Sequence, residues 1–393
     1  MENLRRIRRR SILSTVGLLL VLIAGAGPAF GAPSSVLDDP VLVARLNRGL
    51  DHLYDMELPG ALLVFDELTR DLPGHPIGPL LQAEVVWWEI QTDPLDTGPD
   101  ERFLARIEEA LGLAEDRLQG HPRDIDARFA LAAGHALRGR YRSLRKEWLA
   151  AARDGRKALR WIRELHDRRP HDPDLNLGLG LYDYLSEAAP ERYPVLEILE
   201  PFFPEGDRER GLRTLHRTRR AGRISRVPAA LFLLKIEYYF ETRYRESLDQ
   251  VEWLRDRYPR NSVFHLYEGR IHSRWRQCSR ADEVFREVLA RSSAGWYGYG
   301  EYAREVALFH RARCALLDGR LEESLTQLAR LERLAIRRES DFRSTVHLRR
   351  GMVFDAQGRR SEARTQYRAA LQLPDMGTTH ERARRHLREP WSP

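Results

Sequence analysis

The chain has 393 residues, of which 42% are hydrophobic, 31% are charged and 9% are aromatic. This composition excludes a protein with several membrane spans, each of which needs about 20 apolar residues, and it excludes a wholly disordered chain. The formal net charge is +7, of which the five arginines and one glutamate of residues 1–31 contribute +4, so the rest of the chain carries only +3. So small an excess does not favour nucleic-acid binding, which needs concentrated basic faces.

Residues 1–31 have the three zones of a secretory signal peptide. A basic start is followed by an apolar run from Ile12 to Ala24 and then by a tail of small residues. Ala29 and Gly31 fit the small-residue requirement of a cleavage site, so we expect cleavage after Gly31 and export to the periplasm of a bacterium. The alternative is an uncleaved anchor in the inner membrane that faces the periplasm, although an apolar run of about 13 residues is short for a span. Residues 32–40 are predicted to be a linker.

A helical repeat organises residues 41–375. In eight segments a small residue is followed four positions later by an apolar one, in the pairs Ala61/Phe65, Ala110/Ala114, Ala158/Ile162, Gly211/Leu215, Ser247/Val251, Ala281/Phe285, Ser324/Leu328 and Ala363/Tyr367. A proline that would stop the helix lies eleven or twelve positions after five of the small residues, at Pro73, Pro122, Pro170, Pro259 and Pro374. Small residues also lie twelve positions before four of them, where an antiparallel helix must approach closely, at Gly49, Gly269, Ala312 and Gly351. The sequence therefore predicts an all-α solenoid of about eight antiparallel helical hairpins.

These units resemble the tetratricopeptide repeat (TPR), in which a small residue in each helix and a terminating proline recur over about 34 residues. The resemblance is strongest in residues 43–73 and 345–374 and weaker in the middle, where Lys235 stands at a position expected to be small. Residues 178–184 (GLGLYDY) and 206–212 (GDRERGL) are similar to a central block of an exported bacterial group of TPR proteins. The resemblance implies a TPR-like superhelix that serves as an interaction scaffold and has no known catalytic residues.

The first helix of each hairpin is expected to line the concave face of such a superhelix. Aromatic residues and arginines there would suit an extended peptide, a C-terminal carboxylate or an acidic segment. The candidate groove residues are Trp87, Trp88, His135, Arg138, Asp183, Tyr184, Tyr239, Arg270, Arg274 and Arg313. A second candidate is a glycine-rich loop with Trp296, Tyr297 and Tyr299, which either stacks on a peptide or glycan or buries its rings against neighbouring helices.

Three further segments differ from the repeat. Residues 138–154 carry a basic cluster that either meets an acidic partner or lipid headgroups or is a solvated helix face; the cluster is Arg138, Arg140, Arg142, Arg145 and Lys146. Residues 186–207 are proline-rich and apolar, so they are expected to pack across the superhelix, as the cover of an apolar seam or as a lid. Residues 376–393 are predicted to form a C-terminal capping helix and tail.

No catalytic or metal-binding motif was found, and no cofactor is expected. The chain lacks a His-Glu-x-x-His pair, a phosphate-binding loop ending in Lys-Ser/Thr and a Gly-x-Ser-x-Gly motif. Its two cysteines, Cys278 and Cys314, are too few for a disulfide scaffold or a cysteine-based zinc module. In an exported protein they could be oxidised, or they could stay buried thiols.

We therefore expect a non-catalytic protein–protein interaction scaffold or adaptor of the bacterial cell envelope, which binds a segment of a protein or peptide partner in a concave groove. Nucleic acid is not expected as a partner, and the oligomeric state stays open. One alternative is an enzyme similar to the α/α toroids that acts on glycans with carboxylates such as Glu197 and Glu200. The other is an assembly factor tethered to the membrane by an uncleaved N-terminus.

Overall fold

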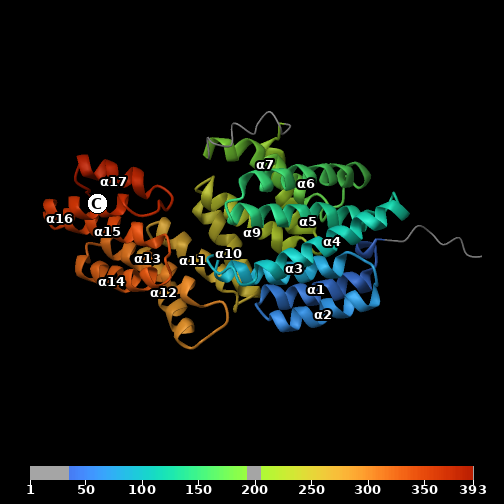
Figure 1. Ribbon diagram of the computed structural model, residues 1–393, viewed down its shortest axis with the longest axis horizontal. Helices are drawn as coiled ribbons and strands as arrows, with labels where there is room; N and C mark the ends of the chain where they lie inside the picture. The colour runs from blue at the N-terminus through green and yellow to red at the C-terminus, as the bar shows by residue number, and fades with distance from the viewer. Residues whose placement is uncertain (1–34, 193–204, 393) are drawn as a thin grey trace, which may run out of the picture.

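The computed structural model describes residues 35–192 and 205–392, and these contain a short 3-10 helix, seventeen α-helices and no strand (Figure 1). The expected all-α fold is confirmed. The elements are η1 Val36–Asp38, α1 Pro40–Tyr54, α2 Leu58–Asp71, α3 Ile77–Thr92, α4 Asp100–Gly120, α5 Ile125–Leu144, α6 Trp148–Arg168, α7 Leu177–Arg192, α8 Arg208–Ala221, α9 Arg226–Tyr239, α10 Tyr244–Arg257, α11 Ser262–Arg274, α12 Cys278–Ser293, α13 Glu301–Leu317, α14 Leu321–Arg337, α15 Phe342–Ala356, α16 Arg360–Leu371 and α17 Thr379–Arg388.

Consecutive helices pack as eight hairpins, from α1 with α2 to α15 with α16. Odd-numbered helices also contact one another, as α3 does with α5, α11 with α13, and α13 with α15. The odd-numbered helices therefore form an inner layer and the even-numbered helices an outer layer. At the end of the chain, α17 packs against α15 and α16. The predicted solenoid of about eight antiparallel hairpins is confirmed.

Close packing within the hairpins depends on the small residues that the sequence pattern singled out. A Cβ atom added to Gly269 would lie 2.5 Å from the Phe285 ring, and one added to Gly351 would lie 2.5 Å from the Tyr367 ring. Real Cβ atoms do not come so near to a ring, so glycine is needed at both positions. The predicted close approach of the two helices is confirmed in these hairpins.

The fifth hairpin has one extra residue in its turn. The Arg243 N–H donates to the carbonyl of Glu237, six residues back, whereas the matching bond in the first, third, sixth, seventh and eighth hairpins spans five. Ser247 Oγ consequently donates to the carbonyl of Leu234 at 3.0 Å. Leu234 is fully buried and takes the close-contact position that the pattern assigned to Lys235. Lys235 lies one residue further along α9 and is half-buried.

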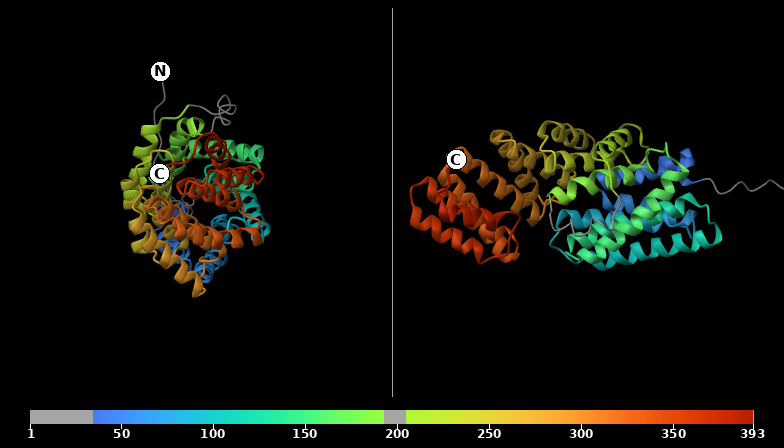
Figure 2. Two further views of the ribbon diagram at one scale, coloured as in Figure 1. Left: turned by 90° about the vertical axis from the view of Figure 1, so that its left-hand side faces the viewer. Right: turned by 90° about the horizontal axis from the view of Figure 1, so that it is seen from above.

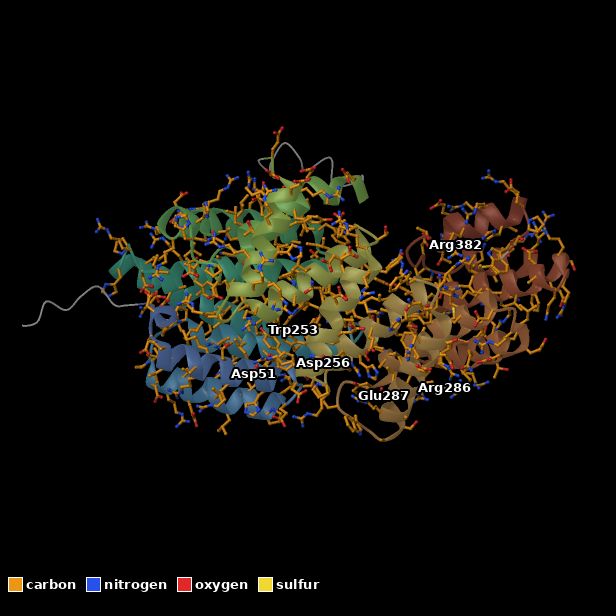
Figure 3. All side chains as sticks on the ribbon, turned by 180° about the vertical axis from the view of Figure 1, so that it is seen from behind. Asp51, Trp253, Asp256, Arg286, Glu287 and Arg382 are labelled. Atoms are coloured by element: carbon orange, nitrogen blue, oxygen red, sulfur yellow. The ribbon has the colours of Figure 1, made fainter. Side chains whose placement is uncertain are left out.

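The inner layer closes on itself where α3 meets α11. The Trp88 and Phe264 ring centroids are 5.6 Å apart, and Asn261 Nδ2 donates to the carbonyl of Tyr54 at 2.6 Å. Seen end on, helices α1 to α11 follow a ring (Figure 2), and Asp51 of α1 lies at this junction (Figure 3). One apolar core runs through much of this closed turn, and a second joins α11 to the arm formed by α12 to α17.

Part of the expected linker packs against the repeat. Ser35 Oγ donates to Asp126 Oδ1 at 2.5 Å, the Val36 N–H donates to Asp126 Oδ2 at 2.9 Å, and Leu37 is 1% exposed. The predicted signal peptide, residues 193–204 of the proline-rich segment, and the carboxylates Glu197 and Glu200 lie outside the described residues. Within residues 35–192 and 205–392, no helix has the length and apolar composition that a membrane span requires.

Candidate ligand-binding face on the inner helices

A basic residue follows the close-contact residue on four inner helices. Consecutive side chains of a helix point about 100° apart. The close-contact residue points at the outer helix, so the residue after it points away from the outer helix. All four side chains are half-buried. The four are Arg140, Lys235, Arg270 and Arg313, which follow Gly139, Leu234, Gly269 and Ala312.

Arg274 on α11, Arg349 on α15 and Arg382 on α17 extend this series along the arm. These seven residues are called the inner basic residues below. No Asp or Glu oxygen of the described residues lies within 4.0 Å of any of the seven cations. Burial lowers the pKa of Arg140, and the negative charge of Glu84 on α3 partly opposes this lowering. The inner layer therefore carries an excess of positive charge without ion-pair partners.

Aromatic rings contact most of these cations instead. The distances from the charged group to the ring centroid are 4.9 Å for Arg140 and Trp87, 5.9 Å for Lys235 and Tyr267, 5.4 Å for Arg270 and Tyr267, 4.9 Å for Arg274 and Tyr238, and 4.3 Å for Arg349 and Phe309. Each such contact offsets about 0.5–2 kcal/mol of desolvation. It leaves the charge itself uncompensated, so the cation remains able to pair with an anion.

Tyrosines lie edge to face beside these cations. The ring centroid of Tyr238 is 4.7 Å from that of Tyr239 and 6.1 Å from that of Tyr267. Arg270 Nη2 donates to the hydroxyl of Tyr302 at 3.0 Å. Tyrosine hydroxyls and guanidinium groups together offer hydrogen-bond donors both to a peptide backbone and to acidic side chains.

The electrostatics of this face show most clearly at Lys235. Burial, together with the charges of Arg140 and Arg270, lowers the pKa of Lys235 to about 7. Three cations from α5, α9 and α11 thus repel one another on the inner layer. An anion bound there would relieve this repulsion and restore the charge of Lys235.

The structure divides the ten predicted groove residues into two sets. Four lie half-buried on the inner layer: Tyr239, Arg270, Arg274 and Arg313. Six lie in the core with at most 7% of their surface exposed: Trp87, Trp88, His135, Arg138, Asp183 and Tyr184. The tryptophans and Tyr184 pack among the helices, where the Tyr184 hydroxyl donates to Glu241 Oε1 at 2.6 Å.

His135 and Arg138 point towards α6 and the buried Asp154. Arg138 Nη2 donates to Asp154 Oδ1 at 2.8 Å, and His135 Nδ1 lies 3.1 Å from the same oxygen. Arg142 Nη1 donates to Asp154 Oδ2 at 2.6 Å. Arg140, which the groove prediction missed, is the residue of this stretch on the inner face. Its position directly after Gly139 is the sequence signal that could have found it.

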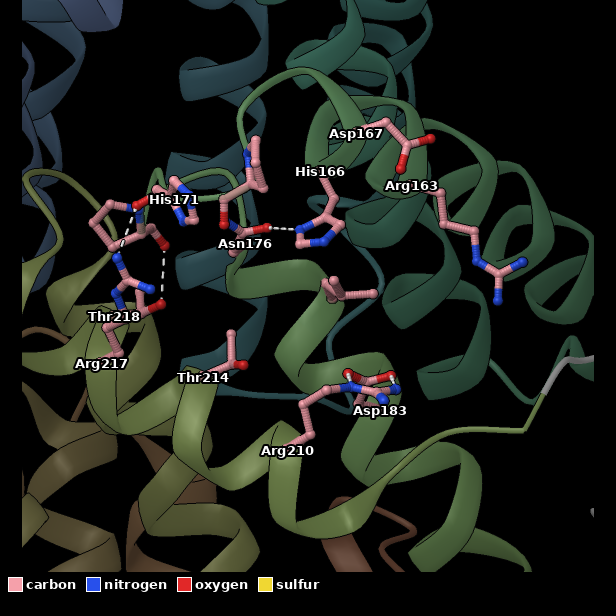
Figure 4. Close-up of a pocket in the computed structure, with 13 residues that line it drawn as sticks. Arg163, His166, Asp167, His171, Asn176, Asp183, Arg210, Thr214, Arg217 and Thr218 are labelled. Carbon is pink, nitrogen blue, oxygen red and sulfur yellow. Dashed lines mark hydrogen bonds and ion pairs between the residues drawn. The ribbon is translucent and has the colours of Figure 1, made fainter.

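The GLGLYDY segment lies in α7, and the GDRERGL segment begins two residues before α8 and continues into it. Helices α7 and α8 form a pocket with α6 (Figure 4). The pocket has a volume of about 490 Å³ and is lined by Asp183 and Arg210 among others. Arg210 Nε and Nη2 donate to the two Asp183 oxygens at 2.7 and 2.8 Å. A Cβ on Gly180 would lie 3.2 Å from the carbonyl of Gly211. These glycines and this ion pair hold α7 closely against α8.

The aromatic loop is divided in the same way. Trp296 is 45% exposed and Tyr297 is 50% exposed, whereas Tyr299 is 1% exposed. The Tyr299 hydroxyl accepts a hydrogen bond from Arg291 Nη1 at 2.9 Å and lies 3.0 Å from His265 Nδ1. Tyr299 therefore fixes the loop to α11 and α12, and the other two rings stay accessible.

The two cysteines are free and buried. Burial and the neighbouring Cys314 raise the pKa of Cys278 to about 12, which keeps its thiol protonated and weakly nucleophilic. Among the described residues, no three His, Cys, Asp or Glu side chains are arranged so that they could hold a metal ion.

No protein-family model matches the chain, and the comparison with curated proteins found no match. Solved structures that are similar include yeast Tom70, with 11% identity and a TM-score of 0.41 over 89% of this chain and 88% of that chain. A tetratricopeptide repeat protein from Parabacteroides merdae has 12% identity and a TM-score of 0.32 over 87% of this chain and 96% of its own. A monomeric mutant of IFIT1 with Gppp-AAAA has 14% identity and a TM-score of 0.30 over 81% and 68%. At these identities, function has to be inferred from the residues of this chain.

Proposed function

We propose that this chain is a non-catalytic interaction scaffold that binds an acidic, extended segment of a partner protein along the inner basic residues. The observation that carries the proposal is the set of seven cations on the inner layer that have no carboxylate within 4.0 Å among the described residues. Elsewhere arginines of this chain do pair with carboxylates, as Arg145 does with Asp100 and Arg338 with Asp93.

An acidic peptide fits this face better than a neutral one. Guanidinium groups bind carboxylates with two parallel hydrogen bonds, and these bonds are stronger than those between neutral groups. The cations lie on α5, α9, α11, α13, α15 and α17, so an extended chain could meet them one after another. A preformed face also lowers the entropy cost of ordering such a segment.

The toroid-like enzyme is the weaker alternative. A toroid needs its first unit to close on its last, whereas here the contact joins α3 to α11 and the arm of α12 to α17 continues beyond it. The carboxylates that would serve that enzyme, Glu197 and Glu200, lie outside the described residues. The inner layer carries basic groups where a glycan hydrolase would need a pair of carboxylates.

A binding assay with a labelled poly-glutamate peptide tests the scaffold function. We expect saturable binding that weakens with salt, and at least a roughly tenfold lower affinity, or about 1.4 kcal/mol, for Arg270→Glu. Arg274→Glu serves as a second variant if Arg270→Glu is poorly folded by circular dichroism. The matched control is Arg245→Glu on the outer helix α10, where the arginine side chain is 75% exposed.

Two results would contradict the proposal. One is an equal affinity of the wild type and of both folded inner-face variants for the peptide. The other is tighter binding of an RNA oligomer of the same charge, with a loss of that binding in the same variants. The second result would replace the protein partner with a nucleic acid.

The proposal includes a location in the bacterial cell envelope, which rests on residues 1–31. A fusion of residues 1–40 to alkaline phosphatase, which is active only outside the cytoplasm, tests the export. N-terminal sequencing of the exported protein then separates cleavage after Gly31 from an uncleaved start that tethers an assembly factor to the membrane. A fusion that is produced in full length but has no phosphatase activity would refute this part of the proposal.

A further inference from the structure

One of the inner basic residues is buried without a polar partner. Arg349 on α15 is 6% exposed, and its Nε has no hydrogen-bond partner among the described residues. Its one interaction in that part of the chain, apart from longer-range charge effects, is the contact of the guanidinium with the Phe309 ring at 4.3 Å. Burial of a charged guanidinium group without an anion costs free energy. None of the described residues supplies that anion, so a bound ligand would stabilise this site.

Two more guanidinium groups flank Arg349. Arg313 lies one turn beyond Phe309 on α13, which packs against α15. Its Nη1 donates to the carbonyl of Ser273 on α11, a neutral acceptor that leaves the charge of Arg313 uncompensated. Arg382 Nη2 lies 3.6 Å from the sulfur of Met352, one turn beyond Arg349, and Arg382 itself lies on α17 (Figure 3). Burial and the charges of Arg313 and Arg382 together hold the pKa of Arg349 well below its usual value. Three positive charges from three helices therefore act on one another, and no carboxylate oxygen of the described residues lies within 4.0 Å of any of them.

We infer that Arg313, Arg349 and Arg382, the arginine triad, form a binding site for a phosphoryl dianion. A phosphate monoester carries nearly two negative charges and three terminal oxygens, whereas a carboxylate carries one charge and two oxygens. The dianion thus compensates more of the triad's charge, and its three terminal oxygens equal the guanidinium groups in number. This inference goes beyond the proposed function, because it requires only these three side chains and not an acidic segment along the whole inner layer.

The test is a calorimetric titration of the purified full chain with inorganic phosphate and, separately, with acetate. The titration is repeated with an acidic peptide that contains one phosphoserine and with its unphosphorylated form. We expect the wild type to bind phosphate, and at least a roughly tenfold loss of affinity in both Arg349→Met and Arg382→Met. Arg245→Met on the outer helix α10, where the arginine side chain is 75% exposed, is the matched control and should bind phosphate as the wild type does. Tighter binding of the phosphopeptide than of its unphosphorylated form would show that the triad also binds a phosphoryl group attached to a peptide.

A second readout separates a ligand site from a structural role. If the triad awaits an anion, Arg349→Met removes an uncompensated buried charge, so its melting temperature without phosphate should equal or exceed that of the wild type. Phosphate should raise the melting temperature of the wild type but not of Arg349→Met.

Three results would overturn the inference: no phosphate binding by the wild type, phosphate binding retained in both triad variants, or equal affinity for acetate and phosphate. The outcome is independent of the poly-glutamate assay. Phosphate binding without poly-glutamate binding would leave the triad as a site and refute the scaffold function, and the reverse result would refute the triad alone.

Discussion

Replacement of Asp154 by asparagine tests how far one buried charge cluster stabilises the closed turn. Asp154 is 1% exposed and accepts hydrogen bonds from Arg138 and Arg142, with His135 beside it. Burial raises the pKa of Asp154, but His135 and the two arginines outweigh burial and hold the pKa at about 2, below the usual 3.8. Asparagine keeps the shape of the side chain and removes the charge.

The expected loss follows from two estimates. The pKa difference corresponds to about 2 kcal/mol of stability at pH 7, at about 1.4 kcal/mol for each pH unit. Removal of one partner of a buried ion pair usually costs about 3–5 kcal/mol, because the other charge stays buried. Arg138 keeps an ion pair with the exposed Glu108. We therefore expect Asp154→Asn to lower the free energy of unfolding by about 2–4 kcal/mol.

Urea unfolding followed by circular dichroism measures this loss. Because the folded-state pKa is depressed, the contribution of Asp154 is fully present above pH 3.8 and disappears as the pH falls towards 2. The gap between variant and wild type should therefore narrow over that range. Arg106→Gln, which breaks the exposed pair of Arg106 with Glu109, is the control and should cost less than about 0.5 kcal/mol. A loss below about 1 kcal/mol for Asp154→Asn, or a gap that does not change with pH, would refute this reasoning.

Other contacts give three further expected outcomes. Lys235 is charged below its pKa of about 7, so poly-glutamate should bind the wild type more weakly as the pH rises through 7, and Lys235→Met should show little change between pH 6 and 8. Asn261→Ala should lower the free energy of unfolding by about 2–4 kcal/mol, since it loses both the N-cap of α11 and the bond to the Tyr54 carbonyl, while Asn261→Ser should recover about 1 kcal/mol by keeping the cap. Gly269→Val should lower the melting temperature, because its side chain would overlap the Phe285 ring.

The hairpins could be predicted because a small residue on the inner helix lies at a fixed sequence distance from the aromatic or apolar residue that it contacts on the outer helix. The third and fifth hairpins show where this spacing stops being informative. In the third, α5 and α6 are long, with 20 and 21 residues, so the pair Ala158 and Ile162 lies two turns beyond the contact of Gly139 with Ala151. In the fifth, one added turn residue rotates the register by about 100°.

The candidate site was harder to predict because it depends on helix rotation and on distant partners. Arg138 and Arg140 are two residues apart, or about 200° around the helix, and one of them meets the buried Asp154 while the other faces the inner layer. The pairing with Asp154 crosses a hairpin, so the local pattern does not show it. Arg349 and Arg382 could not be selected from the sequence, because only the structure shows that no carboxylate of the described residues lies within 4.0 Å of them.

The junction of α3 with α11 has a consequence for how the chain comes to be folded. An open stack of repeats can fold in order as each hairpin leaves the ribosome or the export channel. Here the Tyr258 hydroxyl donates to Asp51, 207 positions earlier in the chain, at 2.6 Å. The apolar surface around Trp88 thus stays uncovered until α11 has emerged, and during that interval the N-terminal half is the part of the nascent protein with the greatest need of a chaperone.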